Sequence, residues 1–398
     1  MNAPGVVDPE VWATDVVIGD GGVVRLRPLR REDGPALLEL AARLSDEAVR
    51  FRFFTAWRPR TEADLEPFLD LDYRERFALV AELDSSIIAI GRYTWDADQD
   101  SAEVAFVVED RHQARGIGTI LLEHLAAIAR SNGIDRFHAS TLWDNRKMLH
   151  VFASAGYQVH RSLDKGVWDI EFGLHDSTAD VVLARERAAE AASVARVLTP
   201  GSVAIVGASR EPGSIGNILF RNMISSGFTG TVFPVNPNAS SVAGVKAFPN
   251  LAAIPDPVDL VVIVVPAAHV AAIIDEAGDA GAGAVVVVSA GFAETGVDGA
   301  AAQDELVRIA HEHGMRLVGP NCIGVINTAD DVRLNATFAP DQPPTGPVGF
   351  ASQSGALGLA ILDVARELGL GLSSFVSVGN KADVSGNDLL QYWDCLLY

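Results

Sequence analysis

The sequence predicts an α/β protein of three successive parts: a domain with a mixed sheet, a domain with a doubly wound parallel sheet, and an incomplete α/β unit. Helical and strand periods are mixed over residues 23–176. From Ser202, short runs rich in Val and Ile alternate with helical segments, which is typical of a parallel sheet covered on both faces. A Pro-rich stretch at 339–347 then precedes a unit with only two expected strands. We therefore expect a tail (1–22), a first domain (23–176), a helical linker (177–198), a second domain (199–338) and an incomplete third domain (339–398).

The elements of the first domain follow from their periodicity and end signals. Leucines at helical spacing predict a helix over 33–44, and Ser45 is a suitable N-cap for a second helix that extends to Phe54. Alternating patterns predict strands at 77–82, 86–95, 102–108 and 136–142 and a strand pair that ends near Leu174. Amphipathic patterns predict helices at 116–131 and 145–154.

Composition limits the classes of function. The 31 Lys and Arg residues against 52 Asp and Glu residues give a formal net charge of −21, which argues against nucleic acid as the main partner. The 2 cysteines are too few for a disulfide framework and suggest a reducing compartment. No signal peptide is visible, and the longest apolar stretch, 258–274, is interrupted by Asp259, Pro266 and His269. We expect a cytoplasmic protein that does not span a membrane.

The most informative motif is Gln113-Ala-Arg-Gly116-Ile-Gly118, which joins an expected strand to an amphipathic helix. Glycines at a helix N-terminus allow a phosphate to approach free backbone N–H groups and the positive end of the helix dipole. An ordinary glycine-rich turn is the alternative.

In its context, Q-x-x-G-x-G resembles the acetyl-CoA site of the GNAT acyltransferases. The downstream pattern from Asn145 to Tyr157 resembles that superfamily's N-x-x-A-x-x-L-Y-x-x-x-G-F motif, and LSDEAVRFRFF resembles the substrate-side helix of Pat-type protein lysine acetyltransferases. The resemblance covers roughly residues 23–175. It implies that main-chain groups of Phe106, Val107 and Val108 contact the acetyl thioester and pantetheine. Backbone N–H groups of Gln113, Arg115, Gly116, Gly118 and Thr119 would hold the pyrophosphate, and Asn145 would contact the pantetheine arm.

The same resemblance suggests a general base and shows one departure. A lysine amine is almost fully protonated at neutral pH, so acyl transfer to it needs a base. Glu103, early on the strand before the phosphate loop, matches the catalytic glutamate of Pat-type enzymes, and its apolar strand neighbours predict a raised pKa. A solvated strand-end carboxylate is the alternative. Phe152 occupies the place of a Tyr that protonates the leaving thiolate in many relatives.

The second domain does not match a dinucleotide site. Its first strand is followed by Gly207-Ala-Ser-Arg-Glu-Pro-Gly213, which lacks the G-x-G-x-x-G spacing, and its second strand ends in Asn-Pro instead of an acid. VGAS, FPVNP, SAGFAE and GPNC instead resemble the CoA-binding domain of ADP-forming acyl-CoA synthetases and the succinyl-CoA synthetase alpha subunit, over about 199–330. By position, Ser209, Asn236, Pro266 and Asn321 would line a site for CoA or acyl-CoA. A sheet that merely retains turn-forming residues is the alternative.

The third unit resembles the start of the next, flavodoxin-like domain of the same synthetases, through ASQSGALG and SVGNKADVSGNDLL. In that family a later phosphohistidine and an ATP-grasp domain complete the ligase. No histidine follows His313 in this chain, so we expect the synthetase-like part to be catalytically dead and to sense CoA or acyl-CoA. His311 and His313 point to opposite sides of a helix, which favours a solvated helix end over a metal site, and we expect no metal.

Together these observations predict an N-acetyltransferase that acts on a protein lysine. The Pat resemblance implies AMP-forming acetyl-CoA synthetase and related acyl-CoA ligases as partners. The alternatives are a subunit of an ADP-forming acyl-CoA ligase, a small-amine acetyltransferase and a non-catalytic CoA sensor. The sequence leaves the oligomeric state open.

Overall fold

The computed structural model describes residues 9–175 and 179–396. The first eight residues of the expected tail and residues 177–178 of the expected linker lie outside this range. The chain forms two compact units. Among the described residues, one contains 9–19 and those from 24 to 186, the other 20–23 and 187–396, and each is described here by itself. Within 9–175 and 179–396, no helix is both long and apolar enough to cross a bilayer.

The first unit contains an eight-stranded sheet in the order β1-β2-β3-β4-β5-β6-β8-β7. Adjacent strands from β2 to β5 pair antiparallel, as do β6, β8 and β7, whereas β5 and β6 pair parallel. The strands are β1 (Thr14–Val17), β2 (Val23–Pro28), β3 (Arg76–Leu83), β4 (Ser86–Asp96), β5 (Ser101–Val108), β6 (Arg136–Leu142), β7 (His160–Asp164) and β8 (Val167–Gly173). The expected tail thus contains a strand, β1. Its four residues carry no fully buried side chain, so the apolar pattern there is weak.

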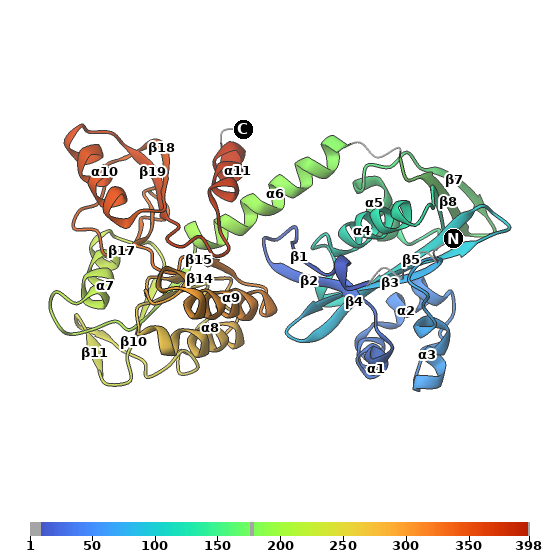
Figure 1. Cartoon of the computed structure of the whole chain (residues 1–398), viewed down its shortest axis with the longest axis horizontal. Helices are drawn as coiled ribbons and strands as arrows, with labels where there is room; N and C mark the ends of the chain where they lie inside the picture. Colours follow the sequence, from blue (N-terminus) through green and yellow to red (C-terminus); the bar gives the residue numbers. More distant parts are fainter. Residues whose placement is uncertain (1–8, 176–178, 397–398) are drawn as a thin grey trace. The chain divides into compact units, whose positions relative to one another are not determined.

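Helices cover both faces of this sheet (Figure 1). Alternate residues of β3 separate the two cores: Phe77 and Leu79 pack with α4, and Ala78 and Val80 with α1 and α3. The helices are α1 (Gly34–Arg43), α2 (Asp46–Phe53), α3 (Glu62–Leu69), α4 (Ile117–Ser131) and α5 (Arg146–Ser154). The expected Ser45 cap is confirmed, since its side chain accepts a hydrogen bond from the Ala48 N–H. Helix α3 was not predicted, although Thr61 and Asp64 form a capping box at its start.

The second unit contains a five-stranded parallel sheet in the order β10-β9-β13-β14-β15. Its core strands are entirely buried, as expected of a sheet covered on both faces. The strands are β9 (Ser202–Val206), β10 (Thr231–Val235), β13 (Leu260–Ile263), β14 (Ala284–Val287) and β15 (Arg316–Val318), with a small hairpin of β11 (Ser241–Val242) and β12 (Val245–Lys246). The helices are α7 (Ile215–Ser225), α8 (Val270–Asp279) and α9 (Val297–Glu312), together with the part of α6 (Ala179–Leu198) that begins at Arg187. The last turns of α6 pack with α7 against one face, and α8 and α9 cover the other.

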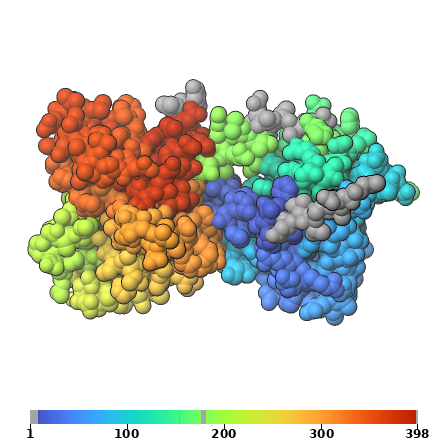
Figure 2. Space-filling model, in the orientation of Figure 1, coloured from blue at the N-terminus to red at the C-terminus, as the bar shows by residue number. Residues whose placement is uncertain are grey.

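A separate four-stranded sheet, in the order β17-β16-β19-β18, crosses the expected boundary at 338/339. Its strands are β16 (Gly324–Asn327), β17 (Leu334–Thr337), β18 (Thr345–Ser352) and β19 (Leu372–Ser377), followed by α11 (Gly386–Leu396), with α10 (Gly355–Glu367) between β18 and β19. β16 pairs antiparallel with both β17 and β19, and β18 pairs parallel with β19. In the space-filling view the residues after about 340, in red, lie directly against orange residues of the same unit (Figure 2).

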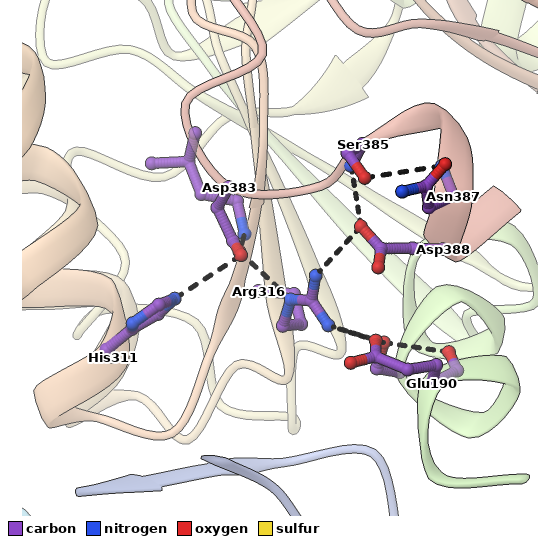
Figure 3. A network of polar contacts seen from close by, with 9 residues as sticks. Glu190, His311, Arg316, Asp383, Ser385, Asn387 and Asp388 are labelled. Atoms are coloured by element: carbon purple, nitrogen blue, oxygen red, sulfur yellow. Dashed lines mark hydrogen bonds and ion pairs between the residues drawn. The ribbon is translucent and has the colours of Figure 1, made fainter. Parts of the chain in front are cut away.

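A buried arginine joins three segments of the second unit (Figure 3). Arg316 on β15, 3% exposed, donates to Asp383 at 3.0 Å and to Glu190 of α6 at 2.9 Å, and it lies 3.4 Å from Asp388. His311 also approaches Asp383, at 3.4 Å, with only 16% of its side chain exposed. The interpretation of His311 as part of a solvated helix end was therefore wrong, because the segment after β19 covers this end of α9.

Candidate functional site

The parallel strands β5 and β6 separate soon after they meet. Their register contains only the pairs Ala102–Phe137 and Glu103–His138, although β5 continues to Val108 and β6 to Leu142. Beyond Glu103, the edge of β5 that faces β6 is thus free of this ladder. Such a gap offers main-chain N–H and C=O groups to an extended ligand, as peptide-like pantetheine requires.

The register of β5 shows which of its backbone groups face the gap. β4 and β5 pair without a bulge, and the Glu109 N–H, just beyond β5, donates to Ile88 O at 2.9 Å. Since alternate residues of an antiparallel strand point their N–H and C=O groups to opposite sides, the groups of Val107 face β4. Those of Phe106 and Val108 face the gap. Of the three residues predicted to contact acetyl-CoA through the main chain, Phe106 and Val108 thus face the gap, whereas the main-chain groups of Val107 pair with β4.

The N-terminus of α4 lies beside the end of β5. Its N-cap is Gly116, with φ 83°, and no side chain caps the helix. Ala114 also has a positive φ, 62°, so the loop turns twice through the left-handed region and can present N–H groups on one side. Gln113 holds this loop in place, since its Nε2 donates to Val108 O at 3.1 Å and its Oε1 accepts from Lys147 at 2.5 Å.

The other residues predicted for acetyl-CoA support this loop. Arg115 Nη1 contacts His112 Nδ1 at 2.8 Å, and the Arg115 carbonyl accepts from the Gly19 N–H. Gly118 and Thr119 are buried in the first turn of α4, and a Cβ at Gly118 would lie 3.3 Å from a methyl of Val151. Gly118 therefore brings α4 close to α5.

Asn145 and Phe152 have structural roles in α5. The Asn145 Oδ1 accepts from the Met148 N–H at 3.1 Å, as an N-cap does, and the side chain is buried. Phe152 is 2% exposed and its ring lies 5.9 Å from that of Phe106 and 5.5 Å from that of Phe172. The side chain at position 152 thus packs behind Phe106.

A pocket lies on the face of the sheet opposite α4. It is lined by apolar side chains of α1, α2, α3, β4 and β5, including Ala105 and Val107, together with Arg52 and Arg92. Glu103 belongs to the same face of β5 by alternation, and it is exposed. Besides its apolar strand neighbours, Glu103 has charged groups near it, since its charge acts on both Arg52 and Arg92.

Sequence reasoning missed these two arginines, although signals for both were present. Arg92 follows Ile90 by two residues on β4, which places both side chains on one face. Arg52 lies three residues after the buried Val49 on α2, on the apolar side of that helix.

In the second unit, the four predicted CoA residues all follow carboxyl ends of the parallel sheet. Ser209 and Pro266 follow β9 and β13, the two strands between which the strand order reverses, where open α/β sheets bind their ligands. Ser209 Oγ accepts from the Glu211 N–H at 3.0 Å, and its carbonyl accepts from Asn217 at 2.8 Å. Asn236 Nδ2 donates to Ala208 O at 2.7 Å, so Asn236 braces the loop that carries Ser209.

Asn321 follows β15 and lies in a different polar cluster. Its Nδ2 donates to Asn380 Oδ1 at 3.2 Å, and Asn380 donates in turn to Glu294 at 2.5 Å and Gln303 at 3.0 Å. Burial opposes ionisation of Glu294, but hydrogen bonds from the Gly291 N–H and Asn380 hold its pKa below its ordinary range. Asn321 thus connects the GPNC turn to the segment after β19.

No group of three or more His, Cys, Asp or Glu side chains suited to a metal ion occurs within 9–175 and 179–396. Cys322 is buried, which raises the pKa of its thiol to about 12.

Comparison with known families assigns the three parts. The model of the acetyltransferase (GNAT) family matches residues 44–157, that of the CoA binding domain 201–328, and that of the succinyl-CoA ligase-like flavodoxin domain 345–395. The crystal structure of the GNAT domain of S. lividans PAT is 40% identical. The match covers 42% of this chain and 99% of that one, with a TM-score of 0.39. The chain contains a GNAT acetyltransferase domain, followed by a CoA-binding domain and a succinyl-CoA ligase-like domain.

The part after the GNAT domain is similar to ADP-forming acetate–CoA ligases. Acetate–CoA ligase I of Archaeoglobus fulgidus is 43% identical over 197 residues, which are 50% of this chain and 28% of that protein. The alpha subunit of acetate–CoA ligase I of Pyrococcus furiosus is 41% identical over 205 residues, 50% of this chain and 44% of the subunit. The chain therefore spans less than half the length of these ligases, and in it a GNAT domain precedes a ligase-like CoA-binding domain.

Proposed function

We propose that the GNAT domain transfers an acetyl group from acetyl-CoA to a lysine of another protein, and that the ligase-like part senses CoA or acyl-CoA. The separation of β5 from β6 beside the uncapped N-terminus of α4 is the observation that carries the proposal. Pantetheine lies in the gap, the pyrophosphate lies at the helix N-terminus, and the lysine enters through the pocket on the other face of β5.

The reaction is a direct acyl transfer. The neutral amine nitrogen attacks the thioester carbon, and a C–N bond forms as the C–S bond breaks. The negative charge on the carbonyl oxygen is stabilised by a backbone N–H of Phe106 or Val108, the groups that face the gap. The amine proton passes to Glu103, the CoA thiolate leaves, and an amide remains on the lysine.

Glu103 acts through water. It lies three residues before Phe106, and at about 3.3 Å per residue of strand the two Cα atoms are ~10 Å apart. A bridging water spans the distance between the carboxylate and the amine, and it agrees with the exposure of Glu103.

The thiolate leaves without an acid at position 152. Phe152 has no ionisable group and packs behind Phe106. A thiol with a pKa of about 8.5 is a tolerable leaving group, so protonation by solvent after departure is sufficient.

The similarity to ADP-forming ligases favours one other function, that of a ligase subunit with an accessory GNAT domain. Such a subunit forms acyl-CoA from acid, CoA and ATP when a chain with the nucleotide-binding part is added. ATP-dependent thioester formation in that mixture distinguishes it from the acetyltransferase.

The test uses labelled acetyl-CoA and purified AMP-forming acetyl-CoA synthetase, the partner that the Pat resemblance suggests. Wild type transfers label to a lysine, whereas Glu103→Gln lowers kcat about 100-fold or more and leaves the Kd for acetyl-CoA unchanged, because only the base is lost. Glu39→Gln, at an exposed position of α1, is the matched control. Label transfer at the wild-type rate by Glu103→Gln would remove Glu103 from the mechanism, and no transfer by wild type to any lysine or small amine would remove the proposal.

A further inference from the structure

The pocket on the acceptor face contains two positive charges that the proposed reaction does not use. Its walls are aliphatic and aromatic except for Arg52 of α2 and Arg92 of β4. Both guanidinium groups lie against the ring of Phe68, with Cζ 6.0 Å from the ring centre for Arg52 and 5.2 Å for Arg92. Two like charges therefore share one largely apolar space.

In the described part of the chain, no carboxylate forms an ion pair with either of these two arginines. Within 9–175 and 179–396, neither arginine forms an ion pair, and Arg52 forms no hydrogen bond to a protein group. Arg92 donates to Thr94 Oγ1 at 2.9 Å and to Pro67 O at 3.3 Å, both uncharged acceptors. The remaining N–H donors of both groups are left to a ligand or to water.

The arrangement is electrostatically unfavourable without an anion. Burial, and after it the repulsion of Arg92, lowers the pKa of Arg52 to about 10, while Glu103 acts in the opposite sense. Burial likewise lowers the pKa of Arg92, again against the effect of Glu103. Glu103 influences both groups from a distance without pairing with either, so an additional carboxylate is the group that best satisfies them.

We propose that Arg52 and Arg92 bind a carboxylate carried on a short apolar stem by one of the two substrates, next to the reacting centre. The proposal rests on the proposed acyl transfer and names a substrate class for the same site. Arg92 is the register partner of Ala105, which immediately precedes Phe106. Arg92 therefore lies beside the residue that precedes Phe106, whose backbone N–H is proposed to stabilise the carbonyl oxygen of the acyl group.

Such a carboxylate has two sources. It is either the terminal carboxylate of a dicarboxylyl group on CoA, such as succinyl, or an acidic side chain beside the target lysine. In both cases it passes the apolar wall formed by Ile90, Ala105 and Val107 before it meets the guanidinium groups. The reaction is unchanged: the C–N bond forms, the C–S bond breaks, and the distant carboxylate takes no part.

The experiment compares matched pairs of substrates with the full chain. One arm compares succinyl-CoA with butyryl-CoA as donor, and the other compares Lys-Glu with Lys-Gln peptides as acceptor of acetyl-CoA. In at least one arm, we expect wild type to favour the carboxylate substrate about 10-fold or more in kcat/KM, as charge-assisted pairing in a largely apolar pocket provides. The arm that shows the preference identifies the source.

Arg52→Met and Arg92→Met remove the charges and keep the length and apolar character of the stems. In each variant, the ratio of kcat/KM for the carboxylate substrate to kcat/KM for its uncharged counterpart falls to about one. Arg136→Met, an exposed arginine of β6, keeps the full preference. Arg52→Lys retains a charge without the planar donors and gives an intermediate preference, which is informative even where Arg52→Met does not fold.

The proposal is overturned if wild type shows no preference in either arm, or if the preference survives in both methionine variants. Equilibrium binding of the same pairs, measured by calorimetry, requires no turnover. A carboxylate preference in binding without transfer to any amine would contradict the proposed function alone, whereas transfer of acetyl without any carboxylate preference would contradict the arginine proposal alone.

Discussion

Arg316 shows how a single residue holds distant segments of the second unit together. A guanidinium with 3% exposure is stable only when carboxylates and hydrogen bonds compensate for its lost hydration. Burial by itself would raise the pKa of Asp383, but the hydrogen bond with His311 and the charge of Arg316 hold it below its ordinary range. Asp383 also accepts the Leu317 N–H at 2.8 Å, so it links the side chain and the backbone of β15.

Removal of the Asp383 charge should therefore destabilise the second unit. A carboxylate whose folded pKa is lowered contributes stability above its unfolded pKa of about 3.9, and this stability is lost as the pH falls through the folded value. We expect Asp383→Asn to lower the free energy of unfolding by about 3 kcal/mol at pH 7 and to weaken its decrease below pH ~4. Urea unfolding across this pH range measures both effects. The control Asp330→Asn, in an exposed pair with Arg333, should change little, and equal effects of the two would refute the role of Asp383.

The role of a residue could be predicted from the sequence where a motif determines the backbone conformation. It was harder to predict where the side chain interacts with residues far away in the sequence. Gly116 adopts the left-handed conformation that the phosphate loop needs, and Asn145 begins a helix, as its position in the motif indicates. The arginines near Glu103 were not predicted, because Arg52 comes from α2, a helix about fifty residues earlier in the chain. Periodicity within β5 carries no information about that helix.

At the level of elements, the N-terminus of α7 packs closely against the end of β9, and this contact shapes the loop between them that carries Ser209. A Cβ on Gly216, the second residue of α7, would overlap the carbonyl oxygen of Gly207 after β9. Gly207 itself has φ 95°, and a side chain there would overlap Val264 O. The N-terminus of α7 thus approaches the sheet only because both positions lack a side chain.

Gly216→Ala should therefore displace α7 and the loop that carries Ser209. We expect a loss of about 1–3 kcal/mol in unfolding free energy, as for other overpacking changes, and weaker CoA binding by the second unit. Chemical denaturation and calorimetry measure the two effects. Gly355→Ala is the matched control at another helix start, since its Cβ would lie 3.5 Å from Ile323 in ordinary contact. Unaltered stability of Gly216→Ala would show that α7 moves freely.

Most elements were predicted because their patterns are local. The strands of the parallel sheet are continuous apolar runs, and α4 carries a clear apolar stripe. The exceptions depend on tertiary pairing. β1 is a four-residue strand beside β2, and β16 and β17 gave no signal that they belong with β18 and β19. Helix α3 contains Pro67, which obscures its helical pattern.

At the level of the whole molecule, the proposed function places one CoA in each unit, with its phosphate at the uncapped N-terminus of α4 in the first and beside Ser209 after β9 in the second. The proposed sensor requires that both be used. The chain should then bind about two equivalents of CoA. If the ligase-like part does not bind CoA, the chain should bind only one.

Ser209→Glu should reduce this stoichiometry to one, because a carboxylate at the end of β9 repels phosphate. It should also change the dependence of the acetylation rate on acetyl-CoA concentration. Ser225→Glu, at the exposed far end of α7, is the control and should retain two equivalents. A single equivalent in wild type, measured by calorimetry, would contradict the sensor.

The order of strands in the smaller sheet has a consequence for synthesis on the ribosome. β16 and β17 can pair as soon as they emerge, but β19, the other neighbour of β16, is made only after the next helix. At a translation rate of about 5–20 residues per second, the edge of β16 that contains Val325 and Ile326 stays unpaired for several seconds until β19 has been synthesised. An open strand edge of this kind recruits other chains. Nascent chains should therefore depend on chaperones most strongly in the interval between Thr337 and Ser377.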